Sequence, residues 1–79
     1  FTVYPNPTNS SGNIFIDISG YNSTGKNELK IYDSMGKMVK SLVLNQSQLN
    51  LNVNFASGIY FINYLNNGLK IATQRLIIN

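Results

Sequence analysis

The sequence predicts an all-β fold, in which about seven short antiparallel strands form a β-sandwich. Apolar and polar residues alternate along several stretches, as they do in strands with one buried face. Turn signals that contain asparagine and glycine recur roughly every 8–12 residues, the spacing expected of such a sandwich. No stretch has the apolar spacing of an amphipathic helix. A small open barrel is the alternative architecture for the same strands.

Residues 29–44 predict a strand, a tight turn and a second strand. Asp33 suits the first position of a type I turn because its carboxylate can accept backbone N–H bonds, and Gly36 suits the last because φ is positive there. A type I turn followed by such a glycine makes a G1 bulge, which closes a short hairpin. Counting outward from the turn predicts three facing pairs, which are Asp33 with Lys37 as a charge pair, Tyr32 with Met38, and Ile31 with Val39. Glu28 is expected diagonal to Lys40.

The chain before this hairpin begins with an extended edge segment. Val3 and Tyr4 lead into Pro5, Asn6 and Pro7, where two prolines fix φ and remove two N–H donors. The elements predicted next are a polar turn over residues 8–12, a strand over 14–19 and a loop over 20–27.

Three further strands are predicted after the central hairpin. Residues 49–54 alternate apolar side chains with asparagines, the pattern of a half-buried antiparallel strand. Residues 59–65 are apolar on both faces except at Asn63, which indicates a strand that is covered on both sides or lies centrally in its sheet. A turn at residues 66–68 leads into the last strand, over residues 69–78.

The register of this last hairpin has two alternatives. A two-residue type I′ turn at Asn67-Gly68 would pair Tyr64 with Ile71 and Ile62 with Thr73. A loop one residue longer would pair Tyr64 with Lys70 and Ile62 with Ala72. Because side chains alternate between faces, a slip of one residue exchanges the two faces of the final strand.

Composition limits both the size and the chemistry of the chain. Its 79 residues suffice for one domain. The chain has no cysteine and no histidine, which excludes disulfides, thiolate metal sites and the usual general base. The net charge is +3, but the six basic residues are scattered, so nucleic acid is not an expected partner. Every apolar run is too short to span a bilayer, so direct membrane insertion is not expected.

The reactive side chains predict that the chain is not an enzyme and holds no metal or cofactor. Its acids are Asp17, Glu28 and Asp33, and each has a local role in a strand or turn, which leaves no converging carboxylate pair. No serine has a histidine to activate it. No glycine-rich phosphate loop and no Ca²⁺ loop is present. The polar residues are mostly uncharged, with thirteen asparagines, a profile typical of an exported β domain.

Four segments, by their order and spacing, resemble a known family. They are Val3-Tyr4-Pro5-Asn6-Pro7, Ile31-Tyr32-Asp33-Ser34-Met35-Gly36-Lys37-Met38-Val39, Ser57-Gly58-Ile59-Tyr60-Phe61-Ile62 and Arg75-Leu76-Ile77-Ile78. Together they are similar to the type A C-terminal sorting domain of the type IX (Por) secretion system of Bacteroidota, over essentially the whole chain. Gln74-Arg75 stands where the family often has a lysine, and arginine keeps the charge.

The resemblance implies an immunoglobulin-like sandwich of seven strands that ends a larger secreted protein, from which residues 1–79 are one excised domain. It implies that an N-terminal passenger reaches the periplasm, where the outer-membrane translocon and its shuttle protein recognise the folded domain. A sortase-like cysteine protease then usually removes the domain, and the passenger is attached to the cell surface or released. No cofactor is implied.

The motif residues carried over from the family are candidates for recognition. They are Tyr4, Pro5, Asn6, Pro7, Asp33, Gly36, Lys37, Val39, Gly58, Tyr60, Arg75, Leu76, Ile77 and Ile78. Turn geometry alone explains Asp33 and Gly36, and residues 5–7 are either a rigid linker or a recognition element. The best docking candidate is the terminal strand over residues 75–78, which would pair its exposed edge with another chain unless it belongs to the core.

A hypothesis of a different class is a passive immunoglobulin-like spacer or an adhesion module. In that case Tyr32 or Tyr60 would stack against carbohydrate. Strand tyrosines more often bury the ring and leave the hydroxyl at the rim. The ordered segments and the lack of catalytic groups therefore favour the sorting hypothesis.

Overall fold

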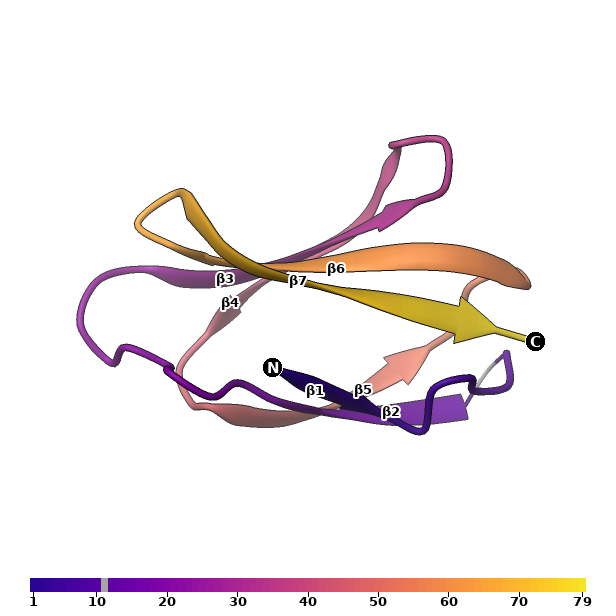
Figure 1. Cartoon of the computed structure of the whole chain (residues 1–79), viewed down its shortest axis with the longest axis horizontal. Coiled ribbons are helices and arrows are strands. Elements are labelled where there is room, and N and C mark those ends of the chain that lie inside the picture. The colour runs from indigo at the N-terminus through magenta and orange to yellow at the C-terminus, as the bar shows by residue number, and fades with distance from the viewer. Residues whose placement is uncertain (11) are drawn as a thin grey trace.

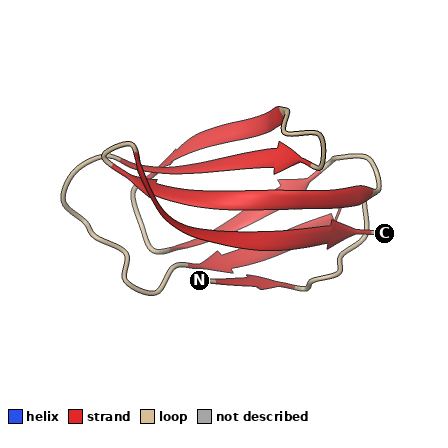
Figure 2. Ribbon diagram, turned by 45° about the horizontal axis from the view of Figure 1, so that its top comes forward, coloured by secondary structure: helices blue, strands red, loops and turns tan. Residues whose placement is uncertain are grey.

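The computed structural model describes residues 1–10 and 12–79, and in these residues the chain forms seven strands and no helix (Figures 1 and 2). The strands are β1 (Thr2–Tyr4), β2 (Gly12–Asp17), β3 (Asn27–Asp33), β4 (Met38–Leu44), β5 (Gln48–Val53), β6 (Gly58–Asn66) and β7 (Leu69–Ile78). Ser11, in the polar turn predicted for residues 8–12, lies outside the described residues. The predicted all-β class is confirmed.

The strands form two antiparallel sheets that lie one over the other (Figure 1). One sheet has the order β1-β2-β5, and the other has the order β4-β3-β6-β7. Because the sheets are separate, the chain forms the predicted sandwich and not the alternative barrel. Strand β6 lies between β3 and β7, which confirms the central position that its apolar sequence predicted.

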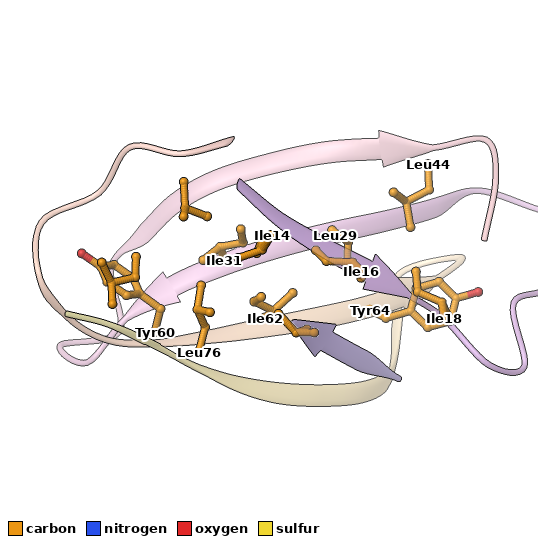
Figure 3. Close-up of a cluster of buried hydrophobic side chains, with 13 residues drawn as sticks. Ile14, Ile16, Ile18, Leu29, Ile31, Leu44, Tyr60, Ile62, Tyr64 and Leu76 are labelled. Carbon is orange, nitrogen blue, oxygen red and sulfur yellow. The ribbon is translucent and has the colours of Figure 1, made fainter. Parts of the chain in front are cut away.

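The core fills the space between the two sheets. Successive side chains of each strand point to opposite faces of the sheet, so one set faces the core and the other faces solvent. Figure 3 shows the inward set, with Tyr60 and Tyr64 at opposite ends of the cluster. Its buried side chains are Val3, Ile14, Ile16, Ile18, Leu29, Ile31, Leu44, Val53, Tyr60, Ile62, Tyr64, Leu76 and Ile78. Each buried aliphatic side chain contributes roughly 1.5–3 kcal/mol, so this cluster is the main source of stability.

The register between β3 and β4 departs from the prediction by one residue. Tyr32 pairs with Met38, as predicted, but Ile31 pairs with Lys40 and not with Val39. A bulge causes the difference, because Val39 is an extra residue between the two pairs. The bulge lets Val39 pack against the buried cluster, although alternation along the rest of β4 would point it outward.

The turn between β6 and β7 is the two-residue turn of the first predicted alternative. Asn67 and Gly68 both have positive φ, at 52° and 80°, which is the type I′ geometry. Asn66 and Leu69 face each other across it. A bulge at Ile71 then interrupts the pairing.

This bulge shifts the rest of β7 beyond both predicted registers. Tyr64 pairs with Ala72, and not with Ile71 or Lys70 as the two alternatives predicted. Ile62 pairs with Gln74, and not with Thr73 or Ala72. Continued without a bulge, the type I′ register would set Arg75 opposite the buried Tyr60, inside the core. The bulge instead turns Leu76 into the core and leaves Arg75 exposed, which avoids burying an unpaired charge.

Candidate functional site

The proline segment, residues 5–7, is bound to the open edge of β7. The Asn6 side-chain amide donates from Nδ2 to the carbonyl oxygen of Arg75 at 2.6 Å. Its Oδ1 accepts the backbone N–H of Ile77 at 2.9 Å. The amide of Asn6 therefore satisfies the two backbone groups that a neighbouring strand would otherwise pair.

Thr8 continues this attachment toward the end of the chain. Its N–H donates to the carbonyl oxygen of Ile77 at 2.9 Å, and its carbonyl oxygen accepts the N–H of Asn79 at 2.8 Å. The two segments run parallel here, with Thr8 opposite Ile78. We refer to Asn6, Thr8 and residues 75–79 as the terminal clasp.

Both prolines beside Asn6 favour this arrangement. Proline has no N–H, so residues 5 and 7 cannot donate to a strand ladder. The peptide bonds before Pro5 and Pro7 are both cis. The side chain of Asn6, and not a backbone ladder, makes the contact with Arg75 and Ile77.

The terminal clasp overturns the expectation of an exposed edge at residues 75–78. Three backbone groups there are already paired, namely the N–H of Ile77 and the carbonyl groups of Arg75 and Ile77. Leu76 and Ile78 lie in the core, with 0% and 2% of their surface exposed. The part of β7 that the clasp leaves uncovered is residues 69–74, at the edge of its sheet.

The central turn has the predicted geometry, but its charge pair does not form. The N–H of Gly36 donates to the Asp33 carbonyl oxygen at 3.0 Å, and φ of Gly36 is 85°. Asp33 Oδ1 accepts the backbone N–H groups of Met35 and Lys37, both at 2.9 Å. The carboxylate thus binds the backbone of Lys37, and the ammonium group of that residue stays at the exposed turn. The structure gives Asp33 and Gly36 roles in shaping the turn.

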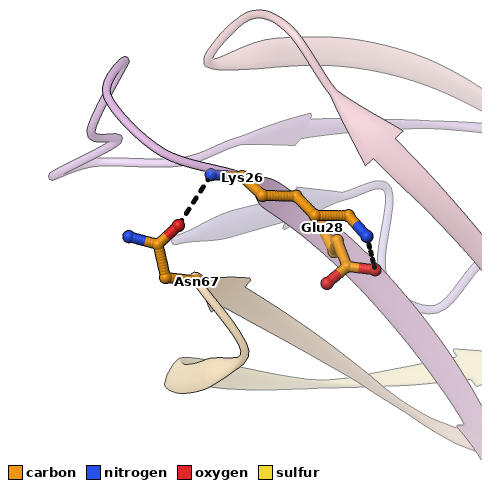
Figure 4. A network of polar contacts seen from close by, with 3 residues as sticks. All are labelled: Lys26, Glu28 and Asn67. Atoms are coloured by element: carbon orange, nitrogen blue, oxygen red, sulfur yellow. Dashed lines mark hydrogen bonds and ion pairs between the residues drawn. The ribbon is translucent and has the colours of Figure 1, made fainter.

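Glu28 also has a different partner from the one predicted. Its Oε2 lies 3.8 Å from Nζ of Lys26 (Figure 4). Its cross-strand neighbour in β4 is Val43, so the expected position diagonal to Lys40 is wrong. Asn67 Oδ1 accepts the backbone N–H of Lys26 at 2.9 Å (Figure 4). The Lys26 side chain is 64% exposed, so this ion pair adds little stability.

Gly58 is the first residue of β6, and Tyr60 connects the start of this strand to the segment before it. The Tyr60 hydroxyl donates to the carbonyl oxygen of Ala56 at 2.6 Å, and its ring lies 5.3 Å from that of Phe55. This is the arrangement of a tyrosine corner, in which a tyrosine near the start of a strand binds the backbone just upstream. Only 6% of Tyr60 is exposed, so the hypothesis that it forms an open carbohydrate platform is wrong.

The outer face of the four-stranded sheet carries a row of apolar side chains that the motifs only partly indicated. Tyr32 faces Met38 on one side and Phe61 on the other, and Phe61 faces Arg75. Ile59 and Ile77 form a neighbouring pair on the same face. We refer to Met38, Tyr32, Phe61, Ile59 and Ile77 as the apolar row. Met38, Ile59 and Phe61 are 49%, 44% and 39% exposed.

The sequence did not predict this surface, because the apolar residues 59–65 were expected to form a strand that is covered on both sides or lies centrally in its sheet. The available signal was that both faces of residues 59–65 are apolar, while only one face of a sandwich sheet can reach the core. The second outer face, on β1-β2-β5, carries Tyr4 from the predicted set and Phe15, which was not predicted.

Two features are absent from the residues that the structure describes. Over residues 1–10 and 12–79, no three histidine, cysteine or acidic side chains gather where they could hold a metal ion. The same residues contain no helix long and apolar enough to cross a membrane.

Comparison with known proteins adds a family to this geometry. The model of the family described as secretion system C-terminal sorting domain matches residues 2–79. A search of curated proteins found no match. The family match begins in β1 and ends beyond β7, so it includes both partners of the terminal clasp.

Proposed function

The chain belongs to the family of secretion system C-terminal sorting domains, the signals of type IX secretion, and from this we propose that it directs an N-terminal passenger through the type IX outer-membrane translocon. The observation that carries this proposal is the family match over residues 2–79. A signal of this type implies a secreted protein that crosses the outer membrane. The two-sheet sandwich supports the proposal because it provides a rigid surface for recognition.

The proposed route has distinct stages and partners. The passenger and the domain reach the periplasm together, and the shuttle protein and translocon recognise the folded domain. A sortase-like cysteine protease then removes it and leaves the passenger on the cell surface or free outside the cell. The protease supplies the chemistry of that step, which fits a chain with neither cysteine nor histidine.

The outer face of the four-stranded sheet is the proposed contact with the translocon. Its apolar row spans β4, β3, β6 and, through Ile77, β7, and Arg75 on β7 lies beside Phe61. Half-exposed large apolar side chains in one continuous group are typical of protein interaction sites. Lys30 belongs to the same outer face as Arg75, so a partner with an apolar groove and an acidic rim fits this surface.

The terminal clasp makes this surface depend on folding. Asn6 and Ile77 are 71 positions apart in the sequence, so they meet only when both ends of the domain are in place. The clasp holds the backbone of Arg75, which positions the cationic end of the apolar row. The translocon would then bind the complete domain and not the separated segments.

A fusion experiment tests this function. Residues 1–79 are placed behind a signal peptide and a fluorescent passenger, and the fusion is expressed in cells with and without the type IX translocon. We expect surface or extracellular fluorescence only in cells that have the translocon. Equal export by both strains would refute the proposal and favour the passive spacer.

A matched pair of variants tests the surface within the same assay. Phe61→Ser removes the centre of the apolar row, and Phe15→Ser removes a similarly exposed aromatic from the opposite face. We expect Phe61→Ser to lower export and Phe15→Ser to leave it unchanged. Equal losses would show that the assay reports stability and would contradict the assigned face.

A further inference from the structure

The outer face of the three-stranded sheet carries two stacked aromatic rings that do not belong to the core. Tyr4 on β1 and Phe15 on β2 face each other across the strand pair. Their ring centroids are 5.6 Å apart, and the ring planes differ by 23°. The side chains are 51% and 45% exposed, so much of both rings faces solvent.

A pocket of about 280 Å³ lies beside these rings. Ile16 and Leu49 also border the pocket, although their side chains pack in or against the core on the other side of the sheet, so the apolar surface of the pocket comes from the two rings. The polar lining is supplied by Asp17, Gln46, Gln48 and Asn50. The pocket therefore combines flat apolar surfaces with amide and carboxylate groups.

The polar groups are arranged to bind hydroxyl groups. Asp17 Oδ2 accepts a long hydrogen bond from Gln48 Nε2, at 3.4 Å, which leaves most of the bonding capacity of both groups for another partner. Asn50 faces Phe15 across the strands, so its amide stands directly beside the aromatic surface. An amide offers both a donor and an acceptor, which matches a hydroxyl that both donates and accepts.

Charge narrows the class of ligand. Asp17 is the one charged residue in the sequences of β1, β2 and β5, and all six basic residues lie in other parts of the chain. A phosphate-bearing ligand such as a nucleotide would need cations beside the stacking rings. A neutral ligand with a flat apolar face and many hydroxyl groups fits this pocket better.

We propose that the pocket lined by Tyr4, Phe15, Asp17, Gln48 and Asn50 binds one ring of a neutral saccharide. The apolar face of the sugar ring lies on the exposed aromatic surface, and its hydroxyl groups bond to Asp17, Gln48 and Asn50. The site is on the opposite sheet from the apolar row, so the domain can bind saccharide and translocon independently.

The test is a titration of the isotope-labelled chain, followed by the backbone amide signals in NMR spectra. The probes are maltohexaose, cellohexaose, mannohexaose and chitohexaose, each added separately up to millimolar concentration. We expect at least one probe to shift signals of β1, β2 and β5, centred on Phe15 and Asn50. Phe15→Ala should weaken that binding by about tenfold, the effect of losing one stacking surface.

Control variants separate binding from folding. Phe61→Ala removes an exposed aromatic from the other sheet and should leave the affinity unchanged. Asn50→Ala changes an exposed side-chain amide that makes no hydrogen bond to the residues that the structure describes, so it should weaken binding while the remaining spectrum stays native. The proposal is overturned if no probe shifts these signals, if the shifts centre on the four-stranded sheet, or if Phe15→Ala and Asn50→Ala bind as tightly as the unchanged chain. None of these results bears on export by the translocon.

Discussion

Asn6 Oδ1 accepts the backbone N–H of Ile77 at 2.9 Å and so joins the two ends of the domain. The same amide donates to the carbonyl oxygen of Arg75. One short side chain therefore performs the role of a neighbouring strand at the edge of β7. This contact links the two terminal segments by which the sequence resembles its family.

Asn6→Ala removes both hydrogen bonds of that amide. Because the site is exposed, water replaces part of the loss, and we expect the free energy of unfolding to fall by about 1–2 kcal/mol. Urea denaturation measures this change, and hydrogen exchange at the Ile77 amide should become faster. Asn54→Ala is the control, since Asn54 is exposed and its side chain makes no hydrogen bond to residues 1–10 or 12–79. If Asn6→Ala has the same urea midpoint and the same Ile77 amide exchange rate as the unchanged chain, the clasp does not stabilise the domain.

Tyr60→Phe tests the tyrosine corner. The substitution keeps the buried ring and deletes the hydroxyl that donates to the Ala56 carbonyl oxygen at 2.6 Å. We expect a loss of about 1–2 kcal/mol in unfolding free energy, because a partly buried carbonyl loses its partner. Tyr4→Phe deletes an exposed hydroxyl and should leave the denaturation midpoint where it is. The same small effect in both variants would show that the corner bond does not stabilise β6.

Gly25→Ala probes the contact between the 20–26 loop and the turn between β6 and β7. Gly25 has φ of +83°, and an added Cβ would lie 2.5 Å from Asn67 Oδ1, the atom that accepts the Lys26 N–H. Gly20 has a similar φ of +77° but nothing within 4 Å of an added Cβ. Thermal denaturation should show a larger loss for Gly25→Ala than for Gly20→Ala, which carries only the backbone cost of about 1–2 kcal/mol. Equal losses would mean that the turn moves aside freely.

The sequence predicted the strands well because their signals are local. Alternation over residues 49–54 and the turn residues Asp33, Gly36 and Asn67-Gly68 each depend on neighbouring positions alone. Two registers failed, and both failures arise from bulges at Val39 and Ile71. A bulge depends on which side chains the core accepts, which turn counting does not include. An exposed position for Arg75 excludes only the type I′ register continued without a bulge, which would set Arg75 opposite the buried Tyr60.

The candidate site was predicted less completely than the fold. The family segments contain both Asn6 and residues 75–78 of the terminal clasp. They did not indicate that the side chain of Asn6 bonds to the backbone of Arg75 and Ile77. Such a contact joins residues far apart in sequence and leaves no periodic signal. Phe15 and Phe61 were missed as exposed aromatics because alternation shows two faces of a strand without showing which one the other sheet covers.

Arg75→Glu tests the charge of the proposed translocon contact. Arg75 is exposed at the end of the apolar row, and its backbone, not its side chain, takes part in the clasp. We expect export of a fused passenger to fall while the free energy of unfolding, measured by urea denaturation, changes by less than about 0.5 kcal/mol. Lys70→Glu makes the same charge change on β7, away from the clasp, and should reduce export less. Normal export of Arg75→Glu would exclude an acidic rim on the partner at this position.

The most direct test of the recognition face is site-specific photocrosslinking during export. A photoreactive amino acid replaces Phe61 on the four-stranded sheet or Phe15 on the three-stranded sheet of the fused domain, and crosslinked partners are identified by mass spectrometry. We predict crosslinks to the outer-membrane translocon from position 61 and none from position 15. Translocon crosslinks from position 15 alone, or from neither position in a fusion that is still exported, would contradict the account.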